Sequence, residues 1–122
     1  MQKQNKFIKS FVCGMKGIGI TFQTQRNARI HAVCAAGVLW AAWYFQVSVT
    51  ELLVLIITIV IVIVAETINT ALETVVNMFT VDYHPLAKKA KDIAAGAVLL
   101  AAFGAAVEGI IIFGPKIIRL FN

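Results

Sequence analysis

Residues 52–77 read LLVLIITIVIVIVAETINTALETVVN, an apolar run that continues into a segment carrying two carboxylates. The apolar part is typical of a membrane-spanning helix, since about 20 such residues cross the hydrocarbon core of a bilayer. At about 100° per residue, four polar side chains then fall within about 80° of one helical face: Glu66, Asn69, Glu73 and Asn77. Ionisable groups in such a segment are costly, which favours a functional role. The alternative is a buried pair satisfied by neighbouring helices, or a helix that has already left the lipid.

The composition also places the chain among membrane proteins. Of its 122 residues, 60% are hydrophobic, and the mean hydropathy is +0.85, whereas a soluble domain is about 45–50% apolar. Three spans of about 20 residues would use about half of the chain. So small a chain has little material with which to enclose a site in lipid, and we expect it to oligomerise.

The basic residues indicate both a partner and a topology. The net charge is +5, but the lysines and arginines stand beside hydrophobic segments, which favours anionic lipid headgroups over nucleic acid as the partner. Most of the 11 lie in residues 1–29 and 82–92, and none lies in the short segment 46–51. The positive-inside rule then predicts that the N-terminus and residues 82–92 are cytoplasmic.

Hydrophobic periodicity divides the chain into a surface helix and three spans. In residues 1–29, apolar side chains recur at helical spacing between lysines and arginines, which predicts an amphipathic helix on the membrane surface. Membrane spans are predicted at 30–47, 52–81 and 93–113, with a polar cytoplasmic loop at 82–92. The second span exceeds the length that a bilayer needs, so its end should reach the headgroups. The predicted class is an all-α integral membrane protein.

These segments bring acids and lysines together on the predicted cytoplasmic side. A carboxylate at the lipid boundary, such as Glu66, is suited to act as a general base on a lipid hydroxyl. Further acids can hold Mg²⁺ on a polyphosphate, and lysines neutralise charge on a phosphoryl group in transfer. On pattern alone, phosphoryl transfer to a lipid ranks above proton-coupled transport through Glu66. Glu108, an acid inside the third span, has no functional explanation.

Three segments carry a resemblance to a known family. AETINTALETVVN, DYHPLAKKAKDIAAGAVL and IIIFGPK, at residues 65–77, 82–99 and 110–116, resemble the small bacterial membrane kinases of the diacylglycerol kinase/undecaprenol kinase family. The ExxNxAxE core with a downstream AKD is its specific signature. The resemblance implies a homotrimer of three-span subunits in the bacterial cell membrane, with shared active sites. Such enzymes transfer the γ-phosphoryl group of MgATP to a lipid hydroxyl.

The resemblance also implies roles for the matching positions. Glu66 matches the general base, supported by Asn69, and Glu73 with Gln25 matches the metal site. The nucleotide-binding positions are Cys13, Gln25, Glu73, Asn77, Asp82, Tyr83, His84, Lys91 and Asp92. The lipid-binding positions are Lys6, Ser10, Met15, Asn27, His31, Glu66 and Ala95.

Two positions depart from the family pattern. Gln25 stands where the family usually has Glu, and Asn77 where it usually has Asp. Each change removes a negative charge from the metal–nucleotide site, and an amide oxygen coordinates Mg²⁺ more weakly than a carboxylate. Three alternatives follow: an undecaprenol kinase, favoured by the short chain and the wording HPLAKKAKDIAAGAV; a diacylglycerol kinase that makes phosphatidic acid; and a weakened or non-catalytic relative.

Overall fold

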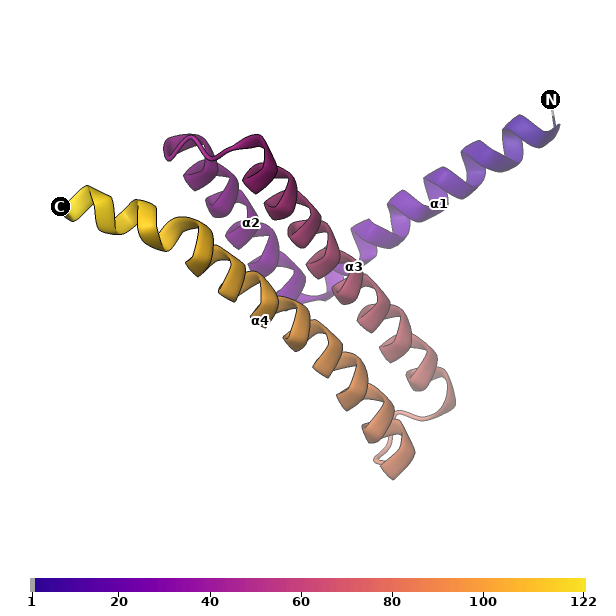
Figure 1. The fold of residues 1–122 in the computed structure, drawn as a ribbon. Helices are drawn as coiled ribbons and strands as arrows, with labels where there is room; N and C mark the ends of the chain where they lie inside the picture. Colours follow the sequence, from indigo (N-terminus) through magenta and orange to yellow (C-terminus); the bar gives the residue numbers. More distant parts are fainter. Residues whose placement is uncertain (1) are drawn as a thin grey trace.

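The computed structural model describes residues 2–122, which form four α-helices in sequence (Figure 1). These are α1 (Gln2–Thr24), α2 (Arg26–Tyr44), α3 (Val49–Phe79) and α4 (Pro85–Phe121). Helix α3 packs against both α2 and α4, while α1 extends away from this bundle (Figure 1). The all-helical prediction is confirmed, and α3 lies at the centre of the bundle as the element that presents polar side chains to its neighbours.

The break between α1 and α2 falls at Gln25, whose backbone is extended with φ −107° and ψ 113°. The Arg29 guanidinium donates to the carbonyl oxygens of Phe22 and Gln23 at 3.1 and 3.0 Å. These two carbonyls belong to the last turn of α1, where no intrahelical donor remains. Helix α1 therefore ends at Thr24, before residue 29 where the predicted surface helix ends, and Arg29 belongs to α2.

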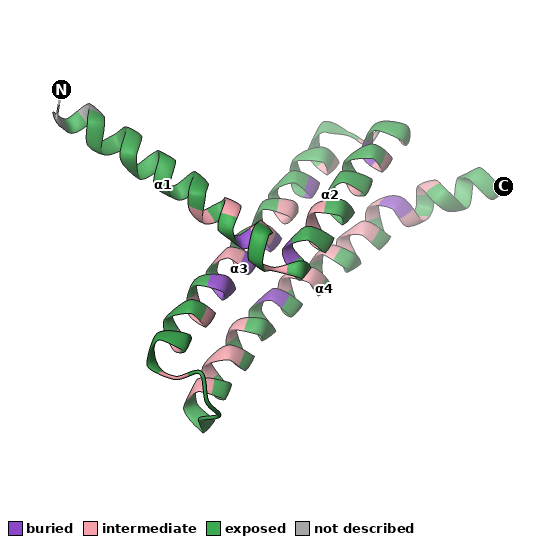
Figure 2. Ribbon diagram, turned by 180° about the vertical axis from the view of Figure 1, so that it is seen from behind, coloured by how far each residue is buried: buried purple, intermediate pink, exposed green. Residues whose placement is uncertain are grey.

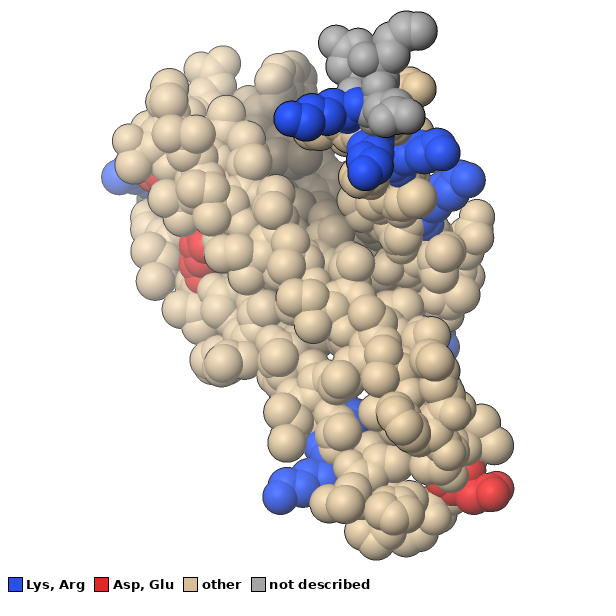
Figure 3. All heavy atoms as spheres, turned by 90° about the vertical axis from the view of Figure 1, so that its right-hand side faces the viewer, with Lys and Arg blue, Asp and Glu red and all other residues tan. Residues whose placement is uncertain are grey.

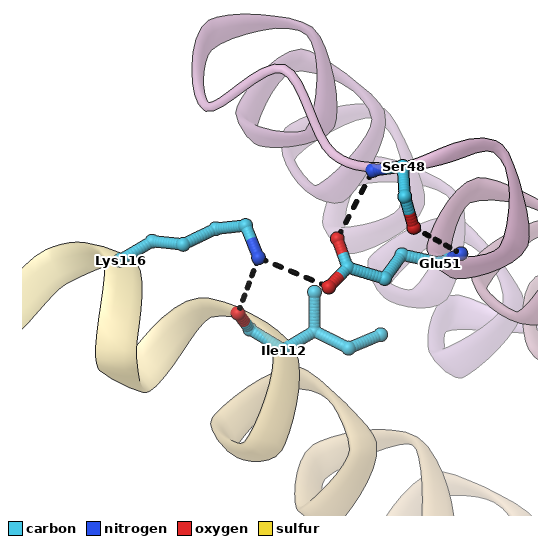
Figure 4. Close-up of polar contacts among 4 residues, drawn as sticks. All are labelled: Ser48, Glu51, Ile112 and Lys116. Atoms are coloured by element: carbon cyan, nitrogen blue, oxygen red, sulfur yellow. Dashed lines mark hydrogen bonds and ion pairs between the residues drawn. The ribbon is translucent and has the colours of Figure 1, made fainter.

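Ser48, Glu51 and Lys116 form a cluster of polar contacts where the chain passes from α2 to α3 (Figure 4). Ser48 caps α3, because its hydroxyl accepts the Glu51 N–H at 3.1 Å while the Glu51 carboxylate accepts the Ser48 N–H at 3.2 Å. Such a capping box satisfies two of the free N–H groups at a helix start. Lys116 of α4 donates to the same carboxylate at 3.1 Å, which ties the far part of α4 to the start of α3.

The connection between α3 and α4 is shorter than the predicted loop. Thr80 is extended and ends α3, and Pro85 is the first residue of α4, with the His84 Nδ1 accepting the Leu86 N–H at 3.1 Å. Proline suits this position because its missing N–H would have no helical partner anyway. Residues 85–92, predicted as loop, therefore form the first turns of a helix of 37 residues.

Little of the bundle is buried within one chain (Figure 2). Among the described residues, α3 and α4 are the two helices long and apolar enough to cross a membrane. Only 17% of the most apolar 18-residue stretch of α3 and 11% of that of α4 is buried. The core helix of a soluble protein would be mostly buried, so these faces are suited to lipid or to another subunit. Helix α2 does not meet the same criterion, and a third span stays a prediction.

Charged side chains gather at the ends of the molecule (Figure 3). Lysine and arginine side chains cluster on α1 and again near the turn between α3 and α4, while most of the visible surface between them is uncharged. Both basic clusters belong to segments for which the positive-inside rule predicts the cytoplasmic side. The turn carries both signs, since Asp82 and Asp92 lie among its lysines.

Candidate active site

The polar face of α3 runs from a buried end to an exposed end. Glu66 is 1% exposed and Asn69 is 7% exposed, whereas Glu73 is half-buried and Asn77 is exposed. The residues follow one another at helical spacing, so they form a single row along the helix. Their surroundings differ steadily along that row, which suits a different chemical role at each end.

Glu66 occupies the buried end of the row beside a histidine of α2. The His31 Nε2 lies 3.3 Å from the Glu66 Oε1, close enough for an ion pair when the imidazole is protonated. This contact does not count as a hydrogen bond, and within residues 2–122 the Glu66 Oε1 has no hydrogen-bond partner. Thr70 donates to the backbone carbonyl of Glu66 at 2.8 Å, so its hydroxyl does not occupy the carboxylate. An oxygen of Glu66 is thus free to accept a proton.

Glu73 is held by two amide groups. The Gln25 Nε2 donates to its Oε2 at 3.1 Å, and the Asn69 Nδ2 donates to its Oε1 at 3.3 Å. Gln25 reaches Glu73 because it lies in the break between α1 and α2, where the chain passes α3. The structure therefore brings together the two positions predicted to hold the metal.

This arrangement fits Mg²⁺ if the side-chain amides of Gln25 and Asn69 are flipped, so that their oxygens face Glu73. The nitrogens of Gln25 and Asn69 face Glu73, but an amide turned over presents its oxygen in nearly the same place. Mg²⁺ is commonly held by one or two carboxylates together with substrate phosphates, and Glu73 supplies one carboxylate. In the part of the chain that the structure describes, no group of three or more His, Cys, Asp or Glu side chains forms a metal site. A metal here would be shared with a phosphate.

The predicted nucleotide-binding residues of the α3–α4 turn and of the start of α4 line one cavity of about 240 Å³. These residues are Asp82, Tyr83, His84, Lys91 and Asp92. The Lys91 Nζ donates to the Asn77 Oδ1 at 2.7 Å, so the exposed end of the polar row contacts a residue that lines this cavity. A nucleotide held there would lie along the row of side chains that leads to Glu66.

Other predicted positions lie apart from this row. The predicted positions on α1 are exposed, on a helix that points away from the bundle (Figure 1): Lys6, Ser10, Cys13 and Met15. Asn27 and Ala95 are also exposed. Within one chain the structure does not bring these residues to Glu66. Their roles stay predictions that require contact with lipid or with another subunit.

A polar pair that the sequence analysis did not identify lies nearer the N-terminal end of α3. The Thr58 Oγ1 donates to the Glu108 Oε2 of α4, while the Glu108 Oε1 is buried and lacks a hydrogen-bond partner among the described residues. Thr58 shares the helical face of Glu66, since it precedes that residue by eight positions. Extending the periodic row toward the N-terminal end of α3 would have found it.

Comparison with known proteins gives consistent matches. The family model described as prokaryotic diacylglycerol kinase matches residues 12–113. The undecaprenol kinase of Bacillus subtilis is 41% identical over 113 residues, which cover 93% of this chain and 92% of that protein. A diacylglycerol kinase of Synechocystis is 43% identical over 91% of this chain and 64% of its own length. The diacylglycerol kinase of Escherichia coli K12 is 30% identical over 84% of each chain.

The matched region contains every element of the candidate site from Gln25 to Asp92. The resemblance noted from the motifs is thereby confirmed. The chain belongs to the prokaryotic diacylglycerol kinase family, and the apolar helices of the structure agree with membership of a family of membrane-associated lipid kinases.

Proposed function

We propose, from the chain's membership of the prokaryotic diacylglycerol kinase family, that it transfers the γ-phosphoryl group of MgATP to the hydroxyl of undecaprenol. The relative in Bacillus subtilis is named undecaprenol kinase and matches nearly end to end. Two further relatives are named diacylglycerol kinase, so diacylglycerol is the second candidate acceptor. The observation that carries the reaction is the buried Glu66, whose Oε1 is free of hydrogen bonds beside His31.

In the proposed reaction Glu66 acts as the general base. Its Oε1 accepts the proton of the lipid hydroxyl while the lipid oxygen forms a bond to the γ-phosphorus. The bond from that phosphorus to the bridging oxygen breaks, and ADP leaves with the electron pair. Asn69 supports this step through Glu73, to which its side chain donates at 3.3 Å.

The exposed end of the row holds the phosphate donor in this proposal. Lys91 and His84 are suited to bind phosphate oxygens, and both line the cavity of the α3–α4 turn. Mg²⁺ bound by Glu73 and Gln25 would neutralise charge on the transferred group. Gln25 supplies an amide where the resemblance leads one to expect a carboxylate, so we propose a metal site that is weak compared with one of two acids.

The assembly and topology complete the proposal. We propose that α2, α3 and α4 all span the membrane, that α1 lies on its cytoplasmic surface, and that three copies associate with shared active sites. The large exposed apolar area of α3 and α4 supports association or lipid contact. In such an assembly, the exposed α1 positions that are predicted to bind lipid would contribute to the active site of a neighbouring subunit.

One assay tests the reaction and its acceptor together. Purified protein receives labelled ATP, Mg²⁺, and undecaprenol or diacylglycerol in parallel, and the products are separated by thin-layer chromatography. We expect label on undecaprenol, absent in Glu66→Gln. Failure to label either lipid, with no recovery in Gln25→Glu, overturns the proposal.

A second candidate, a non-catalytic or weakened relative, rests on the amides themselves. Gln25 is engaged with Glu73 and Asn77 with Lys91, so both amides occupy groups that a metal–nucleotide would need. Binding of ATP without turnover would favour this candidate.

A further inference from the structure

A small cavity of about 90 Å³ lies between α2, α3 and α4. Five residues of α3 line it at helical spacing before Glu66, and they therefore share its face: Leu55, Thr58, Ile59, Val62 and Ile63. His31 also lines the cavity, and its Nε2 is 3.3 Å from Glu66. Glu66 itself does not line the cavity. His31 connects the two, and the cavity extends from His31 toward the N-terminal end of α3.

The walls of this cavity are apolar between two polar sites. At one end stands His31, and farther along stand Thr58 and Glu108, joined by their hydrogen bond. Thr58 precedes Glu66 by eight residues, or about 12 Å along a helix. The intervening wall is made of aliphatic side chains of α2, α3 and α4, among them Ala35 and Ala105. Such a wall favours a hydrocarbon segment over water or a phosphate.

The volume limits what the cavity can hold. An apolar cavity of about 150 Å³ is enough to bind benzene, so one of about 90 Å³ holds only a few carbon atoms. In a prenol, a single chain starts at the carbon that carries the hydroxyl. In a diacylglycerol, the carbon next to the hydroxyl-bearing one carries an acyl ester, and a second ester follows. Only the single chain offers a narrow hydrocarbon segment directly at the reacting oxygen.

We propose that this cavity binds the first carbon atoms of a single-chain lipid alcohol and thereby makes the enzyme select a prenol over a diacylglycerol. The inference rests on the proposed function, because it places the hydroxyl at Glu66. With the hydroxyl there, the chain enters the cavity past His31 and continues into the lipid.

The test fills the cavity from two different helices. Ala35→Leu on α2 and Ala105→Leu on α4 both place a larger side chain in the lining. Each has a matched control in the next residue, Ala36→Leu and Ala106→Leu, which are exposed and do not line the cavity. We expect each filling variant to raise the KM for undecaprenol about tenfold, with the KM for ATP and any diacylglycerol activity changed less than about threefold. The controls should match the unmodified protein.

A binding measurement separates this inference from the kinase reaction. Radiolabelled undecaprenol is bound to the detergent-solubilised protein and its four variants, with thermal unfolding recorded for each. Loss of binding in both filling variants but in neither control supports the subsite even where no label transfer occurs. Undiminished binding in a folded filling variant, or equal loss of activity toward both lipids, overturns it. Because the two filling variants lie on different helices, misfolding of one leaves the other to decide.

Discussion

Glu66 and Glu108 are two carboxylic acids in apolar helices of one bundle, and the structure gives them different surroundings. Each has a buried oxygen without a hydrogen-bond partner in the described part of the chain. Glu66 faces His31 and begins a polar row that continues through Glu73 to the cavity at the α3–α4 turn. Glu108 is engaged by one hydroxyl, that of Thr58.

This difference shows what identifies the functional acid. A free buried oxygen is common to both, so burial alone does not distinguish a base from a packing residue. The decisive feature is a row of polar side chains on the helical face of the acid that leads toward groups able to hold a phosphate donor. Of these two acids, Glu66 alone has such a row among the residues that the structure describes. Changing each acid to its amide tests whether these surroundings decide which acid takes part in the reaction.

The largest expected effect is that of Glu66→Gln. The amide keeps the shape of the side chain but cannot accept the hydroxyl proton, and a positioned base contributes about 10²–10⁴-fold to rate. We expect kcat for transfer to undecaprenol to fall by about 10³-fold, while Glu108→Gln, at a residue that lines the proposed lipid cavity and so bears on the KM for undecaprenol, changes kcat less than about threefold. Equal losses in the two variants would show that the surroundings of Glu66 do not distinguish it from Glu108 in the reaction.

Next in size is the effect of Gln25→Glu, which tests whether the part of the row around Glu73 holds Mg²⁺. A second carboxylate beside Glu73 should bind Mg²⁺ more tightly, so the Mg²⁺ concentration for half-maximal activity should fall about tenfold. The control is Gln23→Glu, which adds the same charge at an exposed position. An unchanged Mg²⁺ requirement would remove Gln25 from the metal site.

A smaller effect is expected when the partner of Glu66 is removed. His31→Leu deletes the only titratable group that the structure places against the Glu66 carboxylate within residues 2–122, and we expect kcat to fall about fivefold with the KM for ATP unchanged. His31→Gln retains an N–H group there and should recover most of this loss. A variant with Leu that retains full kcat would make His31 a spectator of the reaction.

The smallest effect concerns the other acid, and it is an effect on stability. Thr58→Val leaves a half-buried carboxyl group without its donor and should lower the free energy of unfolding by about 1–3 kcal/mol. The double change Thr58→Val with Glu108→Leu should be nearly neutral, because replacing both partners removes the unsatisfied group. Reversible unfolding in mixed micelles measures both variants. A double variant less stable than the single one would indicate a further role for Glu108.

Much of the site follows from local rules. The row from Glu66 to Asn77 depends only on the period of an α-helix, and the start of α4 at Pro85 depends on the missing N–H of proline. The break at Gln25 was not predictable in the same way. It depends on Arg29 capping the carbonyls of Phe22 and Gln23, in a stretch whose apolar spacing favours an uninterrupted helix.

The sequence by itself determined the class of protein, the polar face of α3 and the family, because composition, helical period and motif spacing are properties of neighbouring residues. Tertiary structure alone decided the partners: Gln25 with Glu73, His31 with Glu66, and Thr58 with Glu108. Each of these pairs joins residues far apart in the chain. Periodicity places a side chain on a face of its own helix, but only the packing of one helix on another decides which group it meets.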